Sequence, residues 1–207
     1  MDLKPLATAE REDFAGFLET LSPAQWGAPS LCAGWRVRDV VAHVISYDEL
    51  HGRELAARLA RGRFLLNRAN GLGVAASRER DPAELVALMR RYREPRGLTA
   101  AFGGMVALLD GLIHQQDIRR PLGLPREIPA PRLRAALRCA RLAPPIRAFW
   151  RARGLRLVAT DVDWSGGRGP EVRGPGEALL LAIAGRACAV GELGGPGREV
   201  LARRLGV

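Results

Sequence analysis

The sequence predicts a mostly α-helical protein, with a four-helix bundle over residues 1–125 and a small α+β domain over residues 126–207. Four segments of the first part repeat apolar residues at the i, i+3, i+4, i+7 spacing of a helix with one buried face. Closely spaced prolines at Pro125, Pro129 and Pro131 then indicate a boundary. Beyond them, an alternating pattern of β-branched residues predicts strands, which the first part lacks.

The first two helices of the bundle are bounded by capping residues and turn-forming segments. Thr8 is expected to cap the first helix and Pro23 to end it, with an apolar stripe over residues 14–21. A connection rich in glycine and proline follows. It leads to a second helix from about Val37, whose valines keep the same helical spacing up to Val44.

The third and fourth helices carry clearer signals at their ends. The segment Asp81–Glu84, DPAE, offers a capping aspartate, a proline at the first helical position and a glutamate that closes a capping box. The apolar stripe of this helix covers residues 85–92. The fourth helix is expected over Thr99–Ile118, with residues from Phe102 to Ile113 inside and Pro121 ending it.

The second part is expected to mix helices with strands. In chain order it should contain a helix over residues 132–142, a short helix over 146–153, a strand within 154–164, a turn over 165–170, a strand over 171–174 and a long helix from Pro175.

The net charge of +10 raises the question of nucleic-acid binding. Lys4 is the only lysine among 32 basic residues, so almost all of the positive charge comes from arginine. The arginines are spread along the whole chain, without the dense cluster or the interleaved aromatic residues of a nucleic-acid-binding face. We therefore expect no functional binding to nucleic acid.

The same composition argues against membrane insertion and export. No run approaches the ~18 to 20 apolar residues of a membrane-spanning helix. The N-terminal segment MDLKPLATAEREDF lacks the apolar stretch of a signal peptide. Three scattered cysteines, Cys32, Cys139 and Cys188, are typical of reduced thiols. We expect a cytoplasmic protein, either a monomer or a homodimer.

One flank of the expected fourth helix carries polar residues one turn apart. On a helical wheel at ~100° per residue, Asp110, His114 and Asp117 fall within about 60° of each other, at the edge of the apolar stripe. Ala107 and Gly103 lie on the same edge, about one and two turns before Asp110. Small residues beside a polar cluster leave room for something other than protein.

This spacing suggests a metal site. Asp110 and His114 are four residues apart, so their side chains meet, and they supply two of the three protein ligands of an open catalytic metal site. His43, on the second helix, is the candidate for the third ligand, because facing helices of a bundle can deliver ligands into its interior. Asp39 and Asp117, each about one turn from a histidine, are candidate outer-shell acceptors that fix an imidazole tautomer.

Simpler readings of these residues remain open at this point. An aspartate and a histidine at this spacing also form an ordinary hydrogen-bonded pair on a helix surface. His43 alone is also typical of the edge of a core. His51 stands among charged residues and is expected in solvent, and Cys32 is expected to be a small buried residue rather than a nucleophile.

Three segments carry a resemblance to a known family. They are APSLCAGWRVRDVVAHV over residues 28–44, DGLIHQQDIRRPLG over 110–123, and the segment from GLRLVATDVDW to GELGGPG over 154–197. In this order and separation they resemble the maleylpyruvate isomerase family of mycothiol-dependent enzymes, within the DinB-like superfamily. The resemblance extends over nearly the whole chain.

This resemblance implies a fold and a site. The fold would be a DinB-like four-helix bundle followed by a small α+β domain. A divalent metal, usually zinc, would be bound by His43, Asp110 and His114, although the family's acidic ligand is typically a glutamate, one methylene longer than Asp110. An arginine of the second domain is implicated in the family's active site, and the AGR segment makes Arg186 the nearest match.

The function expected from the resemblance is that of a metalloenzyme with mycothiol as the thiol cosubstrate. It would act as an isomerase or an S-transferase on a small, anionic electrophile, with the metal activating the thiol. Two alternatives remain open: a metal-assisted hydrolase, and a non-catalytic DinB-like stress protein that binds a metal or a ligand.

Overall fold

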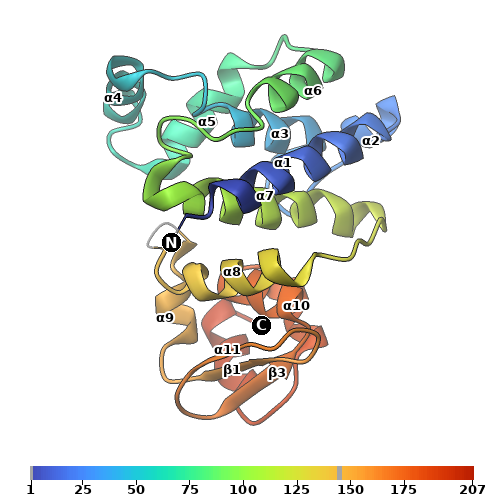
Figure 1. The fold of residues 1–207 in the computed structure, drawn as a ribbon, viewed down its shortest axis with the longest axis vertical. Coiled ribbons are helices and arrows are strands. Elements are labelled where there is room, and N and C mark those ends of the chain that lie inside the picture. The colour runs from blue at the N-terminus through green and yellow to red at the C-terminus, as the bar shows by residue number, and fades with distance from the viewer. Residues whose placement is uncertain (1, 144–145) are drawn as a thin grey trace. The chain divides into compact units, whose positions relative to one another are not determined.

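The computed structural model describes residues 2–143 and 146–207. The chain divides into two compact units, Met1–Pro125 and Arg126–Val207. The described residues form mostly helices, and their strands make a single sheet in the second unit (Figure 1). The mostly α fold class is thereby confirmed. Among the described residues, no helix combines the length and the apolar character needed to cross a lipid bilayer.

The predicted helices of the first unit form its bundle. They are α1 (Lys4–Glu19), α3 (Val37–Ile45), α6 (Pro82–Arg91) and α7 (Ala101–Leu122). Both α1 and α3 pack against α6 and α7, and Figure 1 shows α1 lying along α7. Their apolar stripes meet in a core that is closed to solvent. Its fully buried side chains include Phe14, Leu18, Val41, Ile45, Leu85, Met89 and Ile118.

The capping box predicted for α6 is present, but the expected start of α1 is wrong. Glu84 N–H donates to Asp81 Oδ1 over 2.8 Å, and Asp81 N–H donates to Glu84 Oε2 over the same distance. α1 begins at Lys4, one turn before Thr8. The N–H of Leu3 donates to the carbonyl of Gly103 over 2.7 Å, which ties this end of the helix to α7. A cap at Thr8 is therefore not needed.

The first turn of α7 is not a regular helix. Phe102, Gly103 and Gly104 all have positive φ angles, of 54°, 69° and 90°. A Cβ at Gly104 would come within 3.0 Å of the backbone of Lys4, so the close approach of α1 requires glycine there. Phe102 is 75% exposed, which makes its predicted place inside the bundle wrong. The strained turn also places Gly103 outside the regular helix that carries the polar flank.

Pro121 does not end α7, contrary to the sequence-based expectation. The helix continues through Pro121 to Leu122, and Gly123, with φ 66°, caps it. A proline frees the carbonyl of the residue four positions earlier, here Asp117. That carbonyl accepts the N–H of Leu31 over 2.9 Å, so the segment before α3 satisfies it. The same bond holds this segment against α7.

Three further helices were not predicted. α2 (Pro23–Trp26) is a single turn with a capping box, and α4 (Gly52–Arg61) and α5 (Leu66–Ala76) lie between α3 and α6 in the chain. α4 has no buried residue and α5 buries only small ones and a valine. Neither helix shows the broad apolar stripe by which a bundle helix is recognised in a sequence.

The first unit contains a buried ion pair between α1 and the residues after α3. Both terminal nitrogens of Arg11 donate to the carboxylate of Asp48, over 2.9 and 2.8 Å. Asp48 also accepts the hydroxyl of Thr99 and the N–H of Arg96, over 2.6 and 3.0 Å. Asp48 is therefore fully engaged, and it ties the segment before α7 to the bundle.

The second unit surrounds a small mixed sheet. β1 (Arg156–Ala159) pairs antiparallel with β2 (Ser165–Gly167) and parallel with β3 (Glu171–Gly174), giving the order β2-β1-β3. The predicted strands at β1 and β3 are confirmed. The predicted turn over residues 165–170 is wrong at its start, because Ser165–Gly167 pairs as a strand. Its two glycines carry no side-chain signal for a strand.

After the sheet, the second unit has several short helices in place of the single long helix that was predicted. They are α8 (Ala130–Ala140), α9 (Ala148–Ala152), α10 (Gly176–Ile183), the 3₁₀ helix η2 (Ala187–Glu192) and α11 (Arg198–Leu205). The expected long helix from Pro175 is broken at Gly185, whose φ of 102° is incompatible with a helix. α11 was not predicted.

Candidate metal centre

The bundle brings the three predicted ligands together. His43 lies in the last turn of α3, and Asp110 and His114 lie on successive turns of α7, the helix against which α3 packs. His43 Nε2 is 3.7 Å from Asp110 Oδ1, and His114 Nε2 is 3.3 Å from the same oxygen. The two imidazole rings stand edge to face, with centroids 4.9 Å apart.

These separations fit a tetrahedral metal ion. Two ligand atoms at ~2.0–2.1 Å from a zinc ion, on adjacent corners of a tetrahedron, lie roughly 3.3–3.4 Å apart. The two measured histidine-to-carboxylate distances lie at or slightly above that value. One donor atom from each of His43, Asp110 and His114 lies within 4.8 Å of the others. Two imidazoles and one carboxylate are also a donor set that zinc favours.

Asp117 fixes the orientation of His114. It is fully buried, and its Oδ2 lies 2.8 Å from His114 Nδ1. A carboxylate at this distance accepts the Nδ1 proton, so the lone pair of neutral His114 is on Nε2, the nitrogen that faces Asp110. The structure thus places Asp117 where an outer-shell acceptor for a metal-binding histidine would lie.

Cys32 joins this hydrogen-bonded chain, and sequence reasoning missed it. Its Sγ donates to Asp117 Oδ2 over 3.1 Å and lies 3.7 Å from His114 Nδ1. Cys32 is only partly buried. The bond from Leu31 N–H to the Asp117 carbonyl positions this cysteine, and no helical spacing in the sequence signals it. Cys32, His114 and Asp117 also form a second group of metal-type donors, but it uses the nitrogen that His114 turns towards Asp117.

His43 is held differently from His114. Its Nδ1 is buried and has no hydrogen-bond partner among the described residues. Its ring packs instead against Trp35 and Tyr47, with centroid separations of 5.2 and 6.3 Å. The prediction that Asp39 supports His43 is therefore wrong. The Asp39 carboxylate accepts the N–H of Arg36 over 2.9 Å and caps the start of α3.

The charges of the site stabilise each other. Burial alone would raise the pKa of Asp110, but the charges and hydrogen bonds of His114 and then His43 outweigh it and hold this pKa well below its usual range. Burial alone would lower the pKa of His114. Asp110, Asp117 and Cys32 outweigh that effect, so the pKa of His114 lies well above its ordinary value. A cation that replaces the proton would meet the same negative surroundings.

The remaining candidate residues lie away from this centre or in the second unit. His51 is exposed at the start of α4, as predicted. Arg186 belongs to the second unit, between α10 and η2, where its Nη1 donates to the carbonyl of Ala184 over 3.0 Å. Cys139 and Cys188 are free thiols of the second unit, partly buried and exposed respectively.

The fold and the centre can be compared with known proteins. The chain is similar to a crystal structure of a mycothiol-dependent maleylpyruvate isomerase mutant, with a TM-score of 0.56 and 17% identity, covering 94% of this chain and 90% of that one. A second crystal structure of such an isomerase gives a TM-score of 0.53 and 18% identity, covering 89% and 87%. No curated protein sequence matches the chain.

The protein has the DinB-like maleylpyruvate isomerase fold. Its helical bundle, in which two histidines and an aspartate converge from facing helices, is followed in the chain by a small α+β unit. Residues 7–105 match the sequence family described as the mycothiol maleylpyruvate isomerase N-terminal domain. This match and the two similar structures agree with the resemblance seen in the sequence motifs.

Proposed function

We propose that this protein is a metalloenzyme that uses mycothiol to isomerise a small, anionic electrophile or to transfer the thiol to it. The observation that carries the proposal is the convergence of His43, Asp110 and His114 on one point. The match of residues 7–105 to the mycothiol maleylpyruvate isomerase N-terminal domain supports the choice of thiol. The similar structures are of enzymes whose names give the same thiol and an isomerase activity.

In this proposal each residue of the centre has a separate task. His43, Asp110 and His114 would hold a zinc ion, and Asp117 would keep His114 in the tautomer whose Nε2 can bind it. With two neutral imidazoles and one carboxylate as ligands, the site would keep a single net positive charge. A zinc ion bound there would supply the charge that ionises a thiol near neutral pH.

The thiolate of mycothiol then carries the reaction. It adds to one carbon of an activated cis double bond, forming a C–S bond while the π electrons move towards the activating carbonyl. The remaining single bond rotates, the electrons return and the thiolate leaves, which gives the trans product without net consumption of thiol. In the transfer variant, the carbon next to the carbonyl takes up a proton and the adduct is released.

Arg186 of the second unit is our candidate for a substrate contact, on the basis of the family resemblance. A guanidinium binds a carboxylate through two parallel hydrogen bonds, which suits an anionic substrate. We further propose a cytoplasmic enzyme, since a free low-molecular-weight thiol is kept reduced in that compartment.

Metal content and thiol dependence together test the proposal. Protein purified without chelator should contain about one zinc-like ion per chain, and its turnover of an electrophilic cis-enoate such as maleylpyruvate should require mycothiol. Turnover without thiol would indicate a metal-assisted hydrolase. A metal-containing protein that neither turns over nor binds mycothiol would indicate a non-catalytic binding protein, and protein that takes up no zinc would contradict the proposal.

A further inference from the structure

Arg58 is a partly buried cation of the first unit that stands close to the metal centre. It lies on α4, and its guanidinium carbon is 5.2 Å from the centroid of the Tyr47 ring. Tyr47 in turn presents its ring to His43, with centroids 6.3 Å apart and nearly perpendicular planes. A single aromatic ring therefore separates the guanidinium from one of the proposed metal ligands.

The Arg58 guanidinium lies in a niche formed by Ser46, Tyr47 and Gly73. Its Nη1 donates to the carbonyl and the hydroxyl oxygen of Ser46, each over 3.0 Å. A Cβ at Gly73 would lie 2.8 Å from both Arg58 Nη1 and the Ser46 hydroxyl, so only glycine leaves space for Arg58 at this point of α5. Tyr47, which forms the floor, is fixed by a 2.6 Å hydrogen bond from its hydroxyl to Asn70 Oδ1.

Arg58 has no carboxylate partner among the described residues. Its hydrogen bonds within the described residues use Nη1 alone, which leaves Nη2 and Nε available. The nearby acids are already engaged: Glu54 caps the start of α4 through the N–H of His51, and Glu49 pairs with Arg80. Burial consequently lowers the pKa of Arg58. A partly desolvated guanidinium that is not paired with a carboxylate is costly, and such groups are concentrated at functional sites.

The Tyr47 ring connects this niche to the metal centre, because it lies under the Arg58 guanidinium and also contacts the ring of His43 edge-on. An anion bound at Arg58 would stand within the same small region as a ligand at the open position of the metal.

We propose that Arg58 binds a carboxylate of the substrate through Nη2 and Nε, while the reacting end of the substrate lies at the metal centre. This inference rests on the proposed function and adds to it a binding group from the same unit as the metal ligands. It selects electrophiles that carry a carboxylate some atoms away from the reacting carbon. Arg58 is thereby a specificity-determining residue, separate from the role proposed for Arg186.

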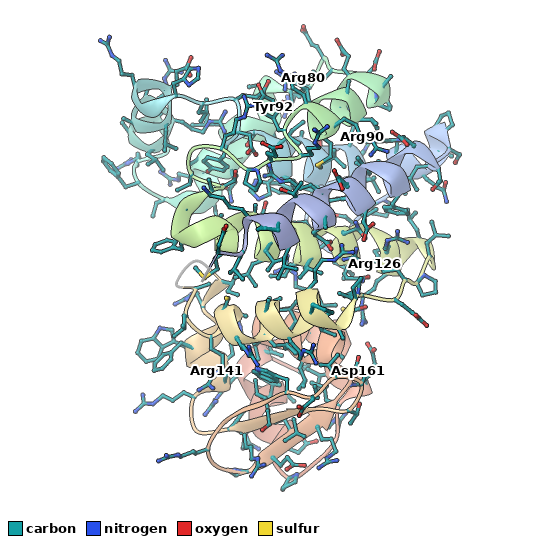
Figure 2. The ribbon with its side chains drawn as sticks, in the orientation of Figure 1. Arg80, Arg90, Tyr92, Arg126, Arg141 and Asp161 are labelled. Carbon is teal, nitrogen blue, oxygen red and sulfur yellow. The ribbon has the colours of Figure 1, made fainter. Side chains whose placement is uncertain are left out.

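A second pocket of the same unit is lined by arginines, and its contribution to anion binding must be separated from that of Arg58. A pocket of about 370 Å³ lies beside Tyr92, and the guanidinium groups of Arg91 and Arg96 lie over its ring, 5.5 and 5.8 Å from the centroid. Figure 2 shows Tyr92 close to Arg80 on the first unit. Arg91 and Arg96 are both exposed, whereas Arg58 is partly buried.

The test measures binding of unreactive dicarboxylates rather than turnover. Succinate, glutarate and adipate are titrated calorimetrically into the zinc-loaded full chain without thiol. The wild type should bind at least one of them, and Arg58→Gln should weaken that binding tenfold or more. Arg58→Lys, which keeps the charge but not the two-pronged geometry, should fall between them. Arg61→Gln, an exposed control on the same helix, and Arg96→Gln should stay within twofold of wild type.

The outcomes separate this inference from the proposed function. Three results would overturn the inference about Arg58. They are equal affinity in wild type and Arg58→Gln, a loss of affinity in Arg96→Gln instead, and no binding to the wild type. If circular dichroism shows that Arg58→Gln is unfolded, the test uses Arg58→Lys, and unchanged affinity in that variant contradicts the inference. The titration is repeated on metal-free protein. Should the wild type take up no zinc, the proposed function fails, while a tenfold loss in Arg58→Gln still supports the anion site.

Discussion

The two histidines of the centre are held in opposite ways. His114 has both ring nitrogens engaged, one towards Asp110 and one with the buried Asp117. His43 turns one nitrogen towards Asp110, while its Nδ1 is buried without a partner and its ring rests on Trp35 and Tyr47. Hydrogen bonding therefore orients one ligand and packing orients the other. The α7 side of the centre should be sensitive to polar substitutions, and the α3 side should not.

The largest expected effect is the loss of a ligand. We predict that His114→Ala and His43→Ala each weaken zinc binding by more than about a hundredfold, because each removes a bond to the metal rather than an outer contact. Competition with a chromogenic chelator measures the affinity. His51→Ala is the matched control, since His51 is exposed on α4, and it should change nothing. Full affinity in His43→Ala would restrict the centre to α7.

The next effect concerns the acceptor behind His114. Asp117→Asn keeps the size of the side chain but removes the charge that accepts the Nδ1 proton. We expect zinc affinity to fall by roughly ten- to a hundredfold without being abolished. Cys32→Ser, which keeps a donor to the same carboxylate, should have a smaller effect. If Asp117→Asn bound zinc as tightly as wild type, the account of how His114 is oriented would be wrong.

The stability of the metal-free protein should depend on pH through the same pair. Because the pKa of His114 is raised in the folded state, its full contribution to the free energy of unfolding is present below the ordinary histidine pKa of about 6.5. That contribution is lost as the pH rises through the folded-state pKa. The lowered pKa of Asp110 means that its contribution is present above about 3.8 and is lost only in stronger acid. Urea unfolding should therefore show a larger difference between wild type and His114→Gln at pH 6 than at pH 9.5.

The smallest expected effect is on the α3 side. Asp39→Ala should leave zinc affinity within about twofold of wild type, because Asp39 caps α3 and does not reach His43. It should nevertheless cost about 0.5–2 kcal/mol in the free energy of unfolding, as the loss of a cap does. A marked loss of zinc affinity at unchanged stability would restore Asp39 as a support of His43 and remove the contrast between the two histidines.

The sequence reveals the α7 side of the site more fully than the α3 side for a physical reason. Asp110, His114 and Asp117 share one helix, so the helical period alone brings them to one flank, and they do lie together. His43 is distant in sequence, and its place beside them depends on how α3 packs against α7. Bundle geometry made His43 a candidate, and the motif resemblance supported that pairing. Cys32 lies in a loop fixed by one backbone bond to α7, which no periodic pattern encodes.

The fold shows the same division between local and tertiary information. Helices with a broad apolar stripe or a capping box, such as α6, were predicted from the sequence. The start of α1 and the end of α7 were not, since the first depends on a bond to Gly103 and the second on Leu31, which satisfies the carbonyl freed by Pro121. α4 and α5 were missed because they bury little apolar surface, and yet α4 carries Arg58.

The most direct test of the metal centre is the zinc affinity of three Asp110 variants, measured by chelator competition on folded protein. Asp110→Asn keeps the size but removes the only ligand charge, so we predict a clear loss of affinity. Asp110→Glu restores the residue that the family typically uses and should retain zinc. Asp110→Ala should bind no more tightly than Asp110→Asn. Equal affinity in wild type and Asp110→Asn, with at most a few tenths of a kcal/mol lost in stability, would show that Asp110 is only a helix-surface partner of His114 and would contradict the proposed metal centre.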